Sequence, residues 1–250
     1  MMDVCRIAAH RGGALEQIEN TLPTFRHAVA IGADEVELDI HRSADGVVVV
    51  HHDATLDRMT SGQGAIGDHD HASLQTLRVG ASETARIPTL EAVLPVLAAS
   101  SVTLRLEVKR APDGAAYPGM LAQAIDRVVA HGLERRFYVT SFHVDDLASL
   151  ASVLGDAKSL LLMEDQTYRA IGPDGLSRKL DTANTREVAL PIGSVDADLL
   201  EQMQKRGIVM SAFGCHDEAR IRKALQLQLP VFTTDRPSLA LALRRQAKTT

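Results

Sequence analysis

The sequence predicts an α/β protein in which helices cover a mostly parallel sheet. Short apolar runs alternate with helix-like segments along all 250 residues, which is the pattern of strands joined by helical crossovers. The hydrophobic fraction of 45% and the charged fraction of 24% are ordinary for a globular protein. This length allows one closed barrel or two smaller domains. Because no change in composition suggests a linker, we expect a single domain over 1–250.

Composition and charge argue against several classes of protein. No apolar run approaches the roughly 18 residues of a membrane span, and a strand-like segment directly follows Met1-Met2-Asp3. We therefore expect no signal peptide and no stable membrane association. A net charge of −5 and the absence of tryptophan argue against a nucleic-acid partner. Cys5 and Cys215 have neither metal-site nor disulfide spacing, so we expect reduced thiols and a cytoplasmic protein. The choice between monomer and homo-oligomer stays open.

The first expected elements have recognisable ends. The apolar run 5–9 predicts a strand that stops at a His-Arg-Gly-Gly sequence. A helix is expected over 22–31, because Asn20 or Thr21 can cap its first turn and Gly32 can end it.

Two strands follow, at 35–40 and 47–52, with only the turn Ser43–Gly46 between them. That link is too short for a helical crossover, which needs about a dozen residues. The regular alternation is therefore broken here, and the relative orientation of the two strands stays open. Residues 54–86 are polar and contain four glycines. They predict a polar excursion over one end of the domain, and loops of that length are often functional.

The rest of the chain returns to alternation, with prolines near helix starts and glycines near helix ends. The expected helices are 88–97, 119–131, 144–154, 196–206 and 216–227, and the expected strands are 103–108, 137–141, 158–163, 187–192, 208–212 and 231–233. This makes nine strand candidates, whereas a closed barrel needs eight. We set aside 187–192, because it contains Pro191. The polar stretch 164–186 stays unassigned, and the polar tail Arg244–Thr250 is expected to fray.

Two carboxylates organise the predicted site. In the strand 35–40 apolar and acidic residues alternate, so Glu37 and Asp39 point to the same side. Two neighbouring carboxylates on a buried face are costly unless a cation or a proton lies between them. With Glu107 on the strand 103–108, they form an all-oxygen site that suits Mg²⁺ or Ca²⁺ rather than zinc.

Other polar residues lie at the same strand ends, where β/α barrels carry their chemistry. His10 and His52 can act as general base and general acid near neutral pH. Arg11 and Lys109 would hold an anion. A metal, an acid, a base and an anion clamp together describe phosphoryl-group chemistry.

Structural readings of the same residues are also open. His10 taken alone could simply end a strand, and Glu37 and Asp39 could face solvent; the joint pattern favours a site. By strand alternation His51 is the outward neighbour of His52. Four histidines are expected at the surface: His27, His69, His71 and His131. Three stay undecided: His41, His143 and His216.

These motifs resemble the glycerophosphodiester phosphodiesterases. The resemblance is carried by His10-Arg11-Gly12, Glu19-Asn20-Thr21, Gly32-Ala33-Asp34, Glu37-Leu38-Asp39, His52-Asp53 with Arg58, Leu106-Glu107-Val108-Lys109, Ser141-Phe142 and Thr234-Asp235-Arg236-Pro237. It implies a TIM barrel that hydrolyses phosphodiesters to glycerol 3-phosphate and an alcohol with a divalent metal. The resemblance implies that His10 and His52 are the acid/base pair. It implies Glu37, Asp39 and Glu107 as metal ligands, and Arg11 and Lys109 as phosphate contacts.

One departure leaves the substrate open. The family usually has a Trp-Thr pair near its seventh barrel strand, whereas this chain reads Ser-Ala-Phe-Gly-Cys at 211–215. A lysophospholipid or a sugar phosphodiester is therefore an alternative substrate. A catalytically silent binding barrel would have lost a histidine or a metal carboxylate, and all are present. The attacking group, a substrate hydroxyl or water, stays open. The motif also leaves open which histidine is the acid and which is the base; we favour His52 as the acid.

Overall fold

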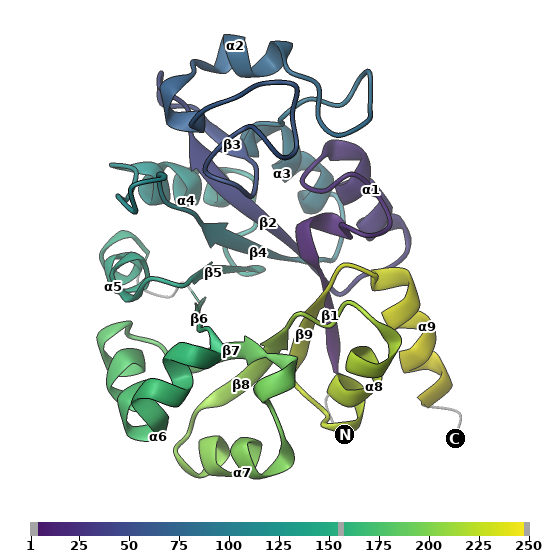
Figure 1. The fold of residues 1–250 in the computed structure, drawn as a ribbon, viewed down its shortest axis with the longest axis vertical. Helices are drawn as coiled ribbons and strands as arrows, with labels where there is room; N and C mark the ends of the chain where they lie inside the picture. The colour runs from purple at the N-terminus through teal and green to yellow at the C-terminus, as the bar shows by residue number, and fades with distance from the viewer. Residues whose placement is uncertain (1–4, 155–157, 248–250) are drawn as a thin grey trace.

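A closed barrel of eight parallel strands forms the centre of the computed structural model, which describes residues 5–154 and 158–247 (Figure 1). The strands are β1 (Arg6–Ala9), β2 (Glu35–Arg42), β4 (Thr103–Val108), β5 (Phe137–Ser141), β6 (Lys158–Leu162), β7 (Glu187–Pro191), β8 (Val209–Phe213) and β9 (Val231–Thr234). They follow one another around the barrel in sequence order, and pairing of β1 with both β9 and β2 closes it. The predicted TIM barrel is confirmed.

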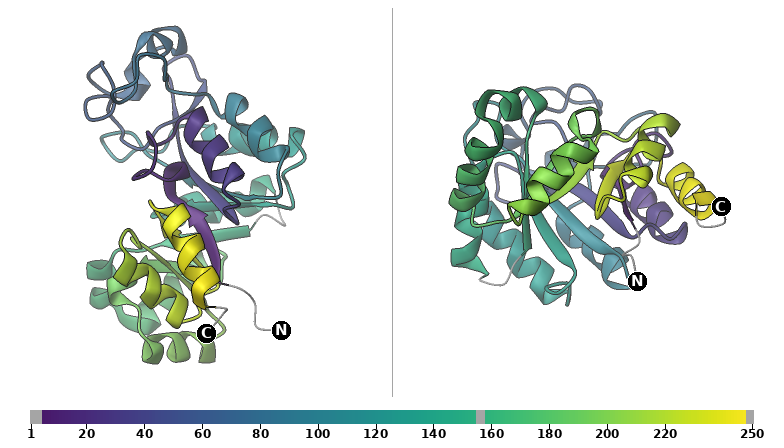
Figure 2. Two further views of the ribbon diagram at one scale, coloured as in Figure 1. Left: turned by 90° about the vertical axis from the view of Figure 1, so that its right-hand side faces the viewer. Right: turned by 90° about the horizontal axis from the view of Figure 1, so that it is seen from below.

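Helices surround the barrel and bury their apolar faces against it (Figures 1 and 2). They are α1 (Leu22–Ala30), α3 (Leu90–Ala98), α4 (Met120–Ala130), α5 (Val144–Val153), α6 (Asp165–Thr182), α7 (Ala197–Lys205), α8 (Glu218–Gln226) and α9 (Pro237–Ala247). Side-chain caps fix several starts: Thr89, Asp196 and Asp217 each accept a hydrogen bond from a backbone N–H in the first turn of α3, α7 and α8. These positions agree with most of the helices that the sequence predicts.

The break in the alternation comes from β3 (Val48–Val50), which pairs antiparallel with the end of β2 and lies outside the barrel. The short turn before β3 is therefore a hairpin connection. Setting aside 187–192 was wrong, because β7 pairs with both β6 and β8. Pro191 is the last residue of β7, where a proline does not interrupt the strand's interior pairing.

The excursion at 54–86 projects from one end of the barrel (Figure 2, left). It contains a 3₁₀ turn (Ile66–Asp68) and the short helix α2 (His71–Thr76). Its apolar residues Leu56, Ile66, Leu74 and Val79 form a small cluster with Val49 of β3 and Ile87, separate from the main core. The excursion is thus polar outside but has an apolar interior.

Two further segments differ from the prediction. The unassigned stretch 164–186 is largely helix α6, with a break at Gly172, whose φ is 61°, just before Pro173. The tail does not fray through residue 247, because it forms the end of α9. There Arg244 donates to the carbonyl of Cys5 and forms an ion pair with Asp34. Residues 248–250 lie outside the described part.

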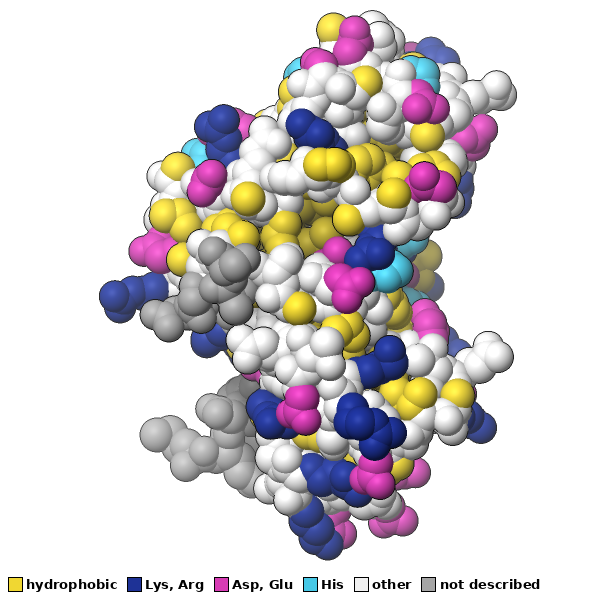
Figure 3. Space-filling view, turned by 90° about the vertical axis from the view of Figure 1, so that its left-hand side faces the viewer, with side chains coloured by type: hydrophobic (Ala, Val, Ile, Leu, Met, Phe, Trp, Pro, Cys, Tyr) yellow, Lys and Arg dark blue, Asp and Glu magenta, His cyan; other side chains and the backbone are white. Residues whose placement is uncertain are grey.

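On the face shown in Figure 3, acidic and basic side chains are interspersed. Among the described helices, none is both long and apolar enough to span a membrane.

Candidate active site

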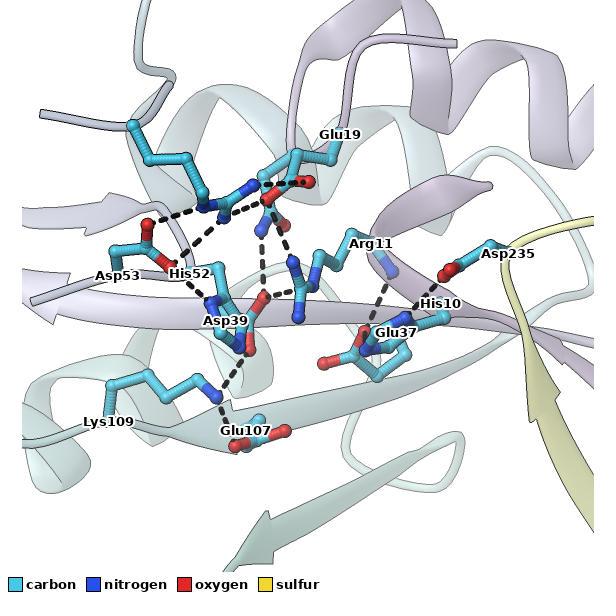
Figure 4. A network of polar contacts seen from close by, with 12 residues as sticks. His10, Arg11, Glu19, Glu37, Asp39, His52, Asp53, Glu107, Lys109 and Asp235 are labelled. Atoms are coloured by element: carbon cyan, nitrogen blue, oxygen red, sulfur yellow. Dashed lines mark hydrogen bonds and ion pairs between the residues drawn. The ribbon is translucent and has the colours of Figure 1, made fainter. Parts of the chain in front are cut away.

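Three carboxylates meet inside the mouth of the barrel. Glu37 and Asp39 come from β2 and Glu107 from β4, and the register of the two strands sets Asp39 beside Glu107. All three are buried, and each offers an oxygen within 4.8 Å of the others. The alternation in β2 therefore does what the sequence predicted, since Glu37 and Asp39 both face inward (Figure 4).

The three buried carboxylates repel one another, and this repulsion shifts their pKa values. Burial raises the pKa of Glu37 well above its ordinary value, and the nearby Asp39 and Glu107 raise it further. Burial also raises the pKa of Glu107, although Lys109 opposes the change. Burial also acts to raise the pKa of Asp39. The nearby positive charges, above all Lys109 and His52, outweigh burial and hold the pKa of Asp39 below its usual range. A cation among these oxygens would remove the repulsion.

Two basic side chains border the trio. The Lys109 ammonium contacts Glu107 and lies 3.1 Å from Oδ1 of Asp39. Nε of Arg11 lies 3.6 Å from Oδ2 of Asp39, and its Nη1 donates to Glu19 at 2.9 Å. Both cations also line the cavity described below, so each is placed to contact an anion bound next to the carboxylates.

In the turn after β1, both the backbone and the side chain of Arg11 contact the carboxylates. Arg11 has a φ of 51°, a conformation that non-glycine residues rarely adopt. In this conformation its N–H donates to Oε2 of Glu37 at 2.7 Å. Gly12 follows with a φ of 82°, and a Cβ there would collide with the side chain of Thr24. Gly12 is therefore required by the geometry of this turn.

His10 is held by a carboxylate from the far end of the chain. Its Nδ1 lies 2.5 Å from Oδ1 of Asp235, and its Nε2 lies 4.0 Å from Oε2 of Glu37. The other oxygen of Asp235 lies 3.0 Å from Nδ1 of His216, whose ring stacks near that of His10. With Nδ1 anchored, Nε2 is the nitrogen of His10 that is available to a substrate.

His52 has the same kind of anchor from a local source. Its Nδ1 lies 2.6 Å from Oδ1 of Asp53, and Asp53 accepts from Nε of Arg58 at 2.6 Å. Arg58 also donates to Glu19, which joins this chain of contacts to Arg11. Burial lowers the pKa of His52 against the opposing effect of Asp39. This favours the neutral ring that a general base needs, whereas the sequence analysis favoured His52 as the acid, so the assignment of the two roles stays a prediction.

One cavity of about 260 Å³ brings the predicted residues together. Six of the seven line it: His10, Arg11, Glu37, His52, Glu107 and Lys109. The seventh, Asp39, is fully buried behind Lys109 and accepts from Asn20 at 2.8 Å. The polar excursion contributes no residue of 54–86 to this lining.

Sequence reasoning missed several residues of the site. Asp235 follows the last barrel strand and had no role beyond its place in a quoted motif. Glu19 and Arg58 belong to the quoted motifs but had no role. Phe142 and Phe213 line the cavity and contact each other edge to face, with ring centroids 5.9 Å apart. Phe213 stands in the segment 211–215, where the family usually has tryptophan, and Phe142 belongs to the quoted Ser141-Phe142 motif.

The remaining histidines lie away from the cavity lining. His51 points away from the cavity as expected, but it is buried rather than outward. His41 is buried too, and it contacts the Tyr117 hydroxyl and the carbonyl of His52. The four that were expected at the surface are all partly exposed. His143 precedes α5.

The carboxyl ends of this TIM barrel's strands bring together anchored histidines, buried carboxylates and two cations that line the cavity. This arrangement defines an enzyme of acid–base chemistry on an anionic substrate. The model of the glycerophosphoryl diester phosphodiesterase family matches residues 10–239. The chain therefore belongs to this family and is a phosphodiesterase.

Individual relatives agree over nearly the whole chain. A glycerophosphodiester phosphodiesterase of Bacillus altitudinis is 28% identical over 251 residues, which cover 97% of this chain and 99% of the relative. One of Caldanaerobacter subterraneus is 25% identical over 247 residues, covering 96% and 98%. The crystal structure of a candidate glycerophosphoryl diester phosphodiesterase from Agrobacterium tumefaciens is 34% identical and superposes with a TM-score of 0.95, covering 98% and 99%.

Proposed function

We propose that this enzyme hydrolyses glycerophosphodiesters to glycerol 3-phosphate and an alcohol, with help from a divalent cation. The observation that carries the proposal is the arrangement of two Nδ1-anchored histidines around one cavity that also contains the carboxylate trio. Acid, base and anion contacts then surround the space that a phosphodiester would occupy.

The carboxylate trio fits a hard cation. Oε1 of Glu37 is buried without a hydrogen-bond partner among the described residues, and Oδ1 of Asp39 has only its ion pair with Lys109. Oxygens are the ligands that Mg²⁺ and Ca²⁺ prefer. Glu37, Asp39 and Glu107 would hold the ion. Such an ion, when bound, polarises the phosphoryl group and offsets its negative charge.

The chain's own residues supply the remaining steps. Arg11 and Lys109 bind and orient the phosphate oxygens. His52 takes the proton of the attacking hydroxyl at its Nε2, and His10 gives a proton from its Nε2 to the departing alcohol. Asp53 and Asp235 keep both rings in the orientation that presents Nε2. Attack by a neighbouring substrate hydroxyl, through a cyclic phosphate, and direct attack by water are both compatible with this arrangement.

A lysophospholipid is the second candidate substrate. Phe142 is 38% exposed, and together with Leu162 and Phe213 it gives one side of the cavity an apolar lining. An acyl chain could lie against these side chains. We found no comparable feature of the described residues that favours a sugar phosphodiester, and the cytoplasmic location and the lack of a nucleic-acid partner stay predictions.

Product analysis tests the proposal. The enzyme is incubated with glycerophosphocholine, glycerophosphoethanolamine, glycerophosphoinositol and lysophosphatidylcholine, each with chelator, Mg²⁺ or Ca²⁺. We expect glycerol 3-phosphate and the free alcohol from the glycerol diesters, in the presence of metal only. Exclusive cleavage of the lysolipid supports the second candidate, and turnover in chelator that equals turnover with metal contradicts the metal role.

A further inference from the structure

A second cavity, larger than the catalytic one, lies between the excursion and the first helices of the barrel. Its volume is about 530 Å³, against about 260 Å³ for the catalytic cavity, and among the described residues the two share no lining residue. One wall comes from the start of α1 and the residues before it, and the other from residues 71–86 and the start of α3. In Figure 1, α1 and α3 lie side by side next to the excursion. The excursion, which adds nothing to the catalytic cavity, thus forms a wall of this one.

One short segment of chain separates the two cavities. Ile18 and Thr21 line the second cavity. Asn20, which lies between them in the chain, points to the catalytic side instead and donates to Oδ2 of Asp39 at 2.8 Å. A ligand in the second cavity would therefore lie behind the catalytic residues without touching them.

The second cavity is basic, although the chain has a net charge of −5. Arg26 and Arg86 line it, and its described lining residues include no Asp or Glu. Nη1 of Arg86 donates to the backbone carbonyls of Glu83 and Ala85 at 3.0 and 2.9 Å, which holds the guanidinium without neutralising its charge. Among the described residues, neither arginine forms an ion pair, and the side chain of Arg26 has no hydrogen-bond partner. Two positive charges thus border this cavity without a counter-charge.

A buried nitrogen without a partner belongs to the same cavity. Nε2 of His71 is buried and has no hydrogen-bond partner in the described part of the chain, and His71 lines the cavity. Its backbone is fixed at the start of α2, where the N–H donates to Asp45 at 2.9 Å. A buried polar atom that lacks a partner costs free energy. A ligand in the cavity would supply that partner.

These groups fit a small phosphate monoester. Guanidinium and imidazole groups donate hydrogen bonds, and guanidinium groups match phosphate oxygens in geometry as well as in charge. A monoester carries roughly two negative charges near neutral pH, which suits two arginines without a counter-charge. Ile18, Leu22 and Ile87 provide apolar lining beside them, as a carbon skeleton requires. The volume lies within the roughly 300–1,000 Å³ of small-molecule sites.

We propose that this cavity is a second binding site, which holds a small phosphate monoester between α1 and the excursion. Arg26 binds the phosphate from the side of the barrel, and Arg86 and His71 bind it from the side of the excursion. The ligand joins these two parts of the molecule and stabilises the folded state, because the unfolded chain has no such site. The site is distinct from the catalytic residues, so it does not depend on which diester the enzyme cleaves.

Calorimetric titration tests the site with glucose 6-phosphate, AMP and inorganic phosphate as probes, and with glucose as the neutral counterpart. Chelator is present, because the carboxylates without a cation then disfavour an anion at the catalytic residues. The wild-type protein should bind the phosphates and not glucose. Arg26→Gln combined with Arg86→Gln should weaken binding of glucose 6-phosphate at least about 10-fold, because hydrogen bonds between charged groups are lost.

Two exposed arginines that line neither cavity give the matched control, Arg135→Gln combined with Arg178→Gln. This variant has the same change in net charge and should keep the affinity within about 2-fold. Arg11→Gln, which weakens anion binding at the catalytic side, should also keep it within about 2-fold. Thermal melts establish that each variant is folded.

Hydrogen exchange locates the probe without any substitution. Bound glucose 6-phosphate should slow amide exchange in 17–26 and 82–92 and leave the turn 10–13 at the catalytic side unchanged. It should also raise the melting temperature of the wild type more than that of the variant without Arg26 and Arg86.

The opposite results overturn the inference. Absence of binding by all three phosphates shows that the cavity is no anion site. Binding that is lost in Arg11→Gln but kept without Arg26 and Arg86 places the probe at the catalytic residues. Equal weakening in the Arg135 and Arg178 control shows that only the overall charge attracts the anion. Each of these results leaves the proposed function untouched, because none concerns cleavage of a diester.

Discussion

Nδ1 of His10 lies 2.5 Å from Oδ1 of Asp235, although 225 residues separate the two in the chain. His10 follows β1 and Asp235 follows β9, and these strands pair to close the barrel. The contact that anchors one of the two histidines is thus a direct product of closure. Burial acts to raise the pKa of Asp235, but hydrogen bonds from His10 and His216 outweigh it and keep the carboxyl ionised.

Asp235→Asn should leave the fold intact and lower turnover by roughly 10²- to 10⁴-fold, because an amide that donates to Nδ1 favours the neutral ring, whose Nε2–H is a much weaker proton donor than that of a protonated ring paired with a carboxylate. Steady-state kinetics and a thermal melt measure the two effects. Asp198→Asn, an exposed substitution in α7, serves as the control. A loss below about fivefold with an unchanged melt would show that the anchor of His10 is dispensable.

Glu37→Gln should separate the stability of the site from its activity. Glu37 is buried and lacks a partner for Oε1 among the described residues, and its raised pKa means that the folded state costs free energy when the group ionises. In chelator the variant should therefore melt at a higher temperature than the wild type, while its activity with Mg²⁺ or Ca²⁺ falls by at least roughly 10²-fold.

The sign of the pH dependence follows from the same shift. Above the unfolded pKa of about 4.3, the unfolded chain loses a proton that the folded protein still holds, so this group's contribution to stability falls as pH rises toward the folded pKa. The advantage of Glu37→Gln should thus grow from pH 5 to pH 7.5 in chelator. Metal should reverse it, because the ion stabilises only the wild-type trio. Glu201→Gln, exposed on α7, should show neither effect, and a pH-independent difference would contradict the argument.

The excursion should be removable without loss of chemistry. Thr60 and Val79 form an antiparallel bridge, so residues 61–78 can be replaced by two glycines with the chain ends already adjacent. Ile66 and Leu74, both fully buried in the small cluster, are lost, so the melting temperature should fall. Turnover of a small nitrophenyl phosphodiester should stay within about 3-fold, because none of 61–78 lines the cavity. Unfolding of the shortened chain would show that the small cluster supports the barrel.

Local patterns were enough to predict most of the fold and most of the residues that line the candidate site. Alternation in 35–40 placed Glu37 and Asp39 together, and the strand ends gave His10, His52 and Lys109, because these features depend on neighbouring residues only. Features that depend on pairing between distant segments could not be read locally. The orientation of β3, the membership of β7 and the contact of Asp235 with His10 are all set by which strands adjoin in the closed barrel.

The sequence also does not predict which charged side chains pair with each other at the surface. Arg244 looked like a tail residue, yet its contact with Asp34 ties α9 to the loop before β2. Arg58 lies in the polar excursion, but it joins Asp53 to Glu19 beside the site. Charged residues carry no periodic signal that reveals such partners, whereas apolar residues do.

The acid and base roles of the two histidines can be assigned by the leaving group. His10→Ala and His52→Ala should each lose roughly 10²- to 10⁴-fold in turnover of a natural diester, and the double variant should lose far less than the product, because residues that act as a unit are not additive. His51→Ala is the control; His51 is buried but does not line the cavity, so it should lower stability and leave turnover within about 3-fold.

A nitrophenyl phosphodiester then separates the pair, since its leaving group departs without a proton. The variant that lost the general acid should recover most of its rate on this substrate, and the variant that lost the base should not. The lowered pKa of His52 favours the neutral base form in the free enzyme, so we expect His10→Ala to be rescued. Rescue of His52→Ala instead would restore the sequence-based assignment of His52 as the acid. Rescue of neither variant, with both proteins folded, would mean that leaving-group protonation does not limit the reaction, and the paired acid–base mechanism would then be wrong.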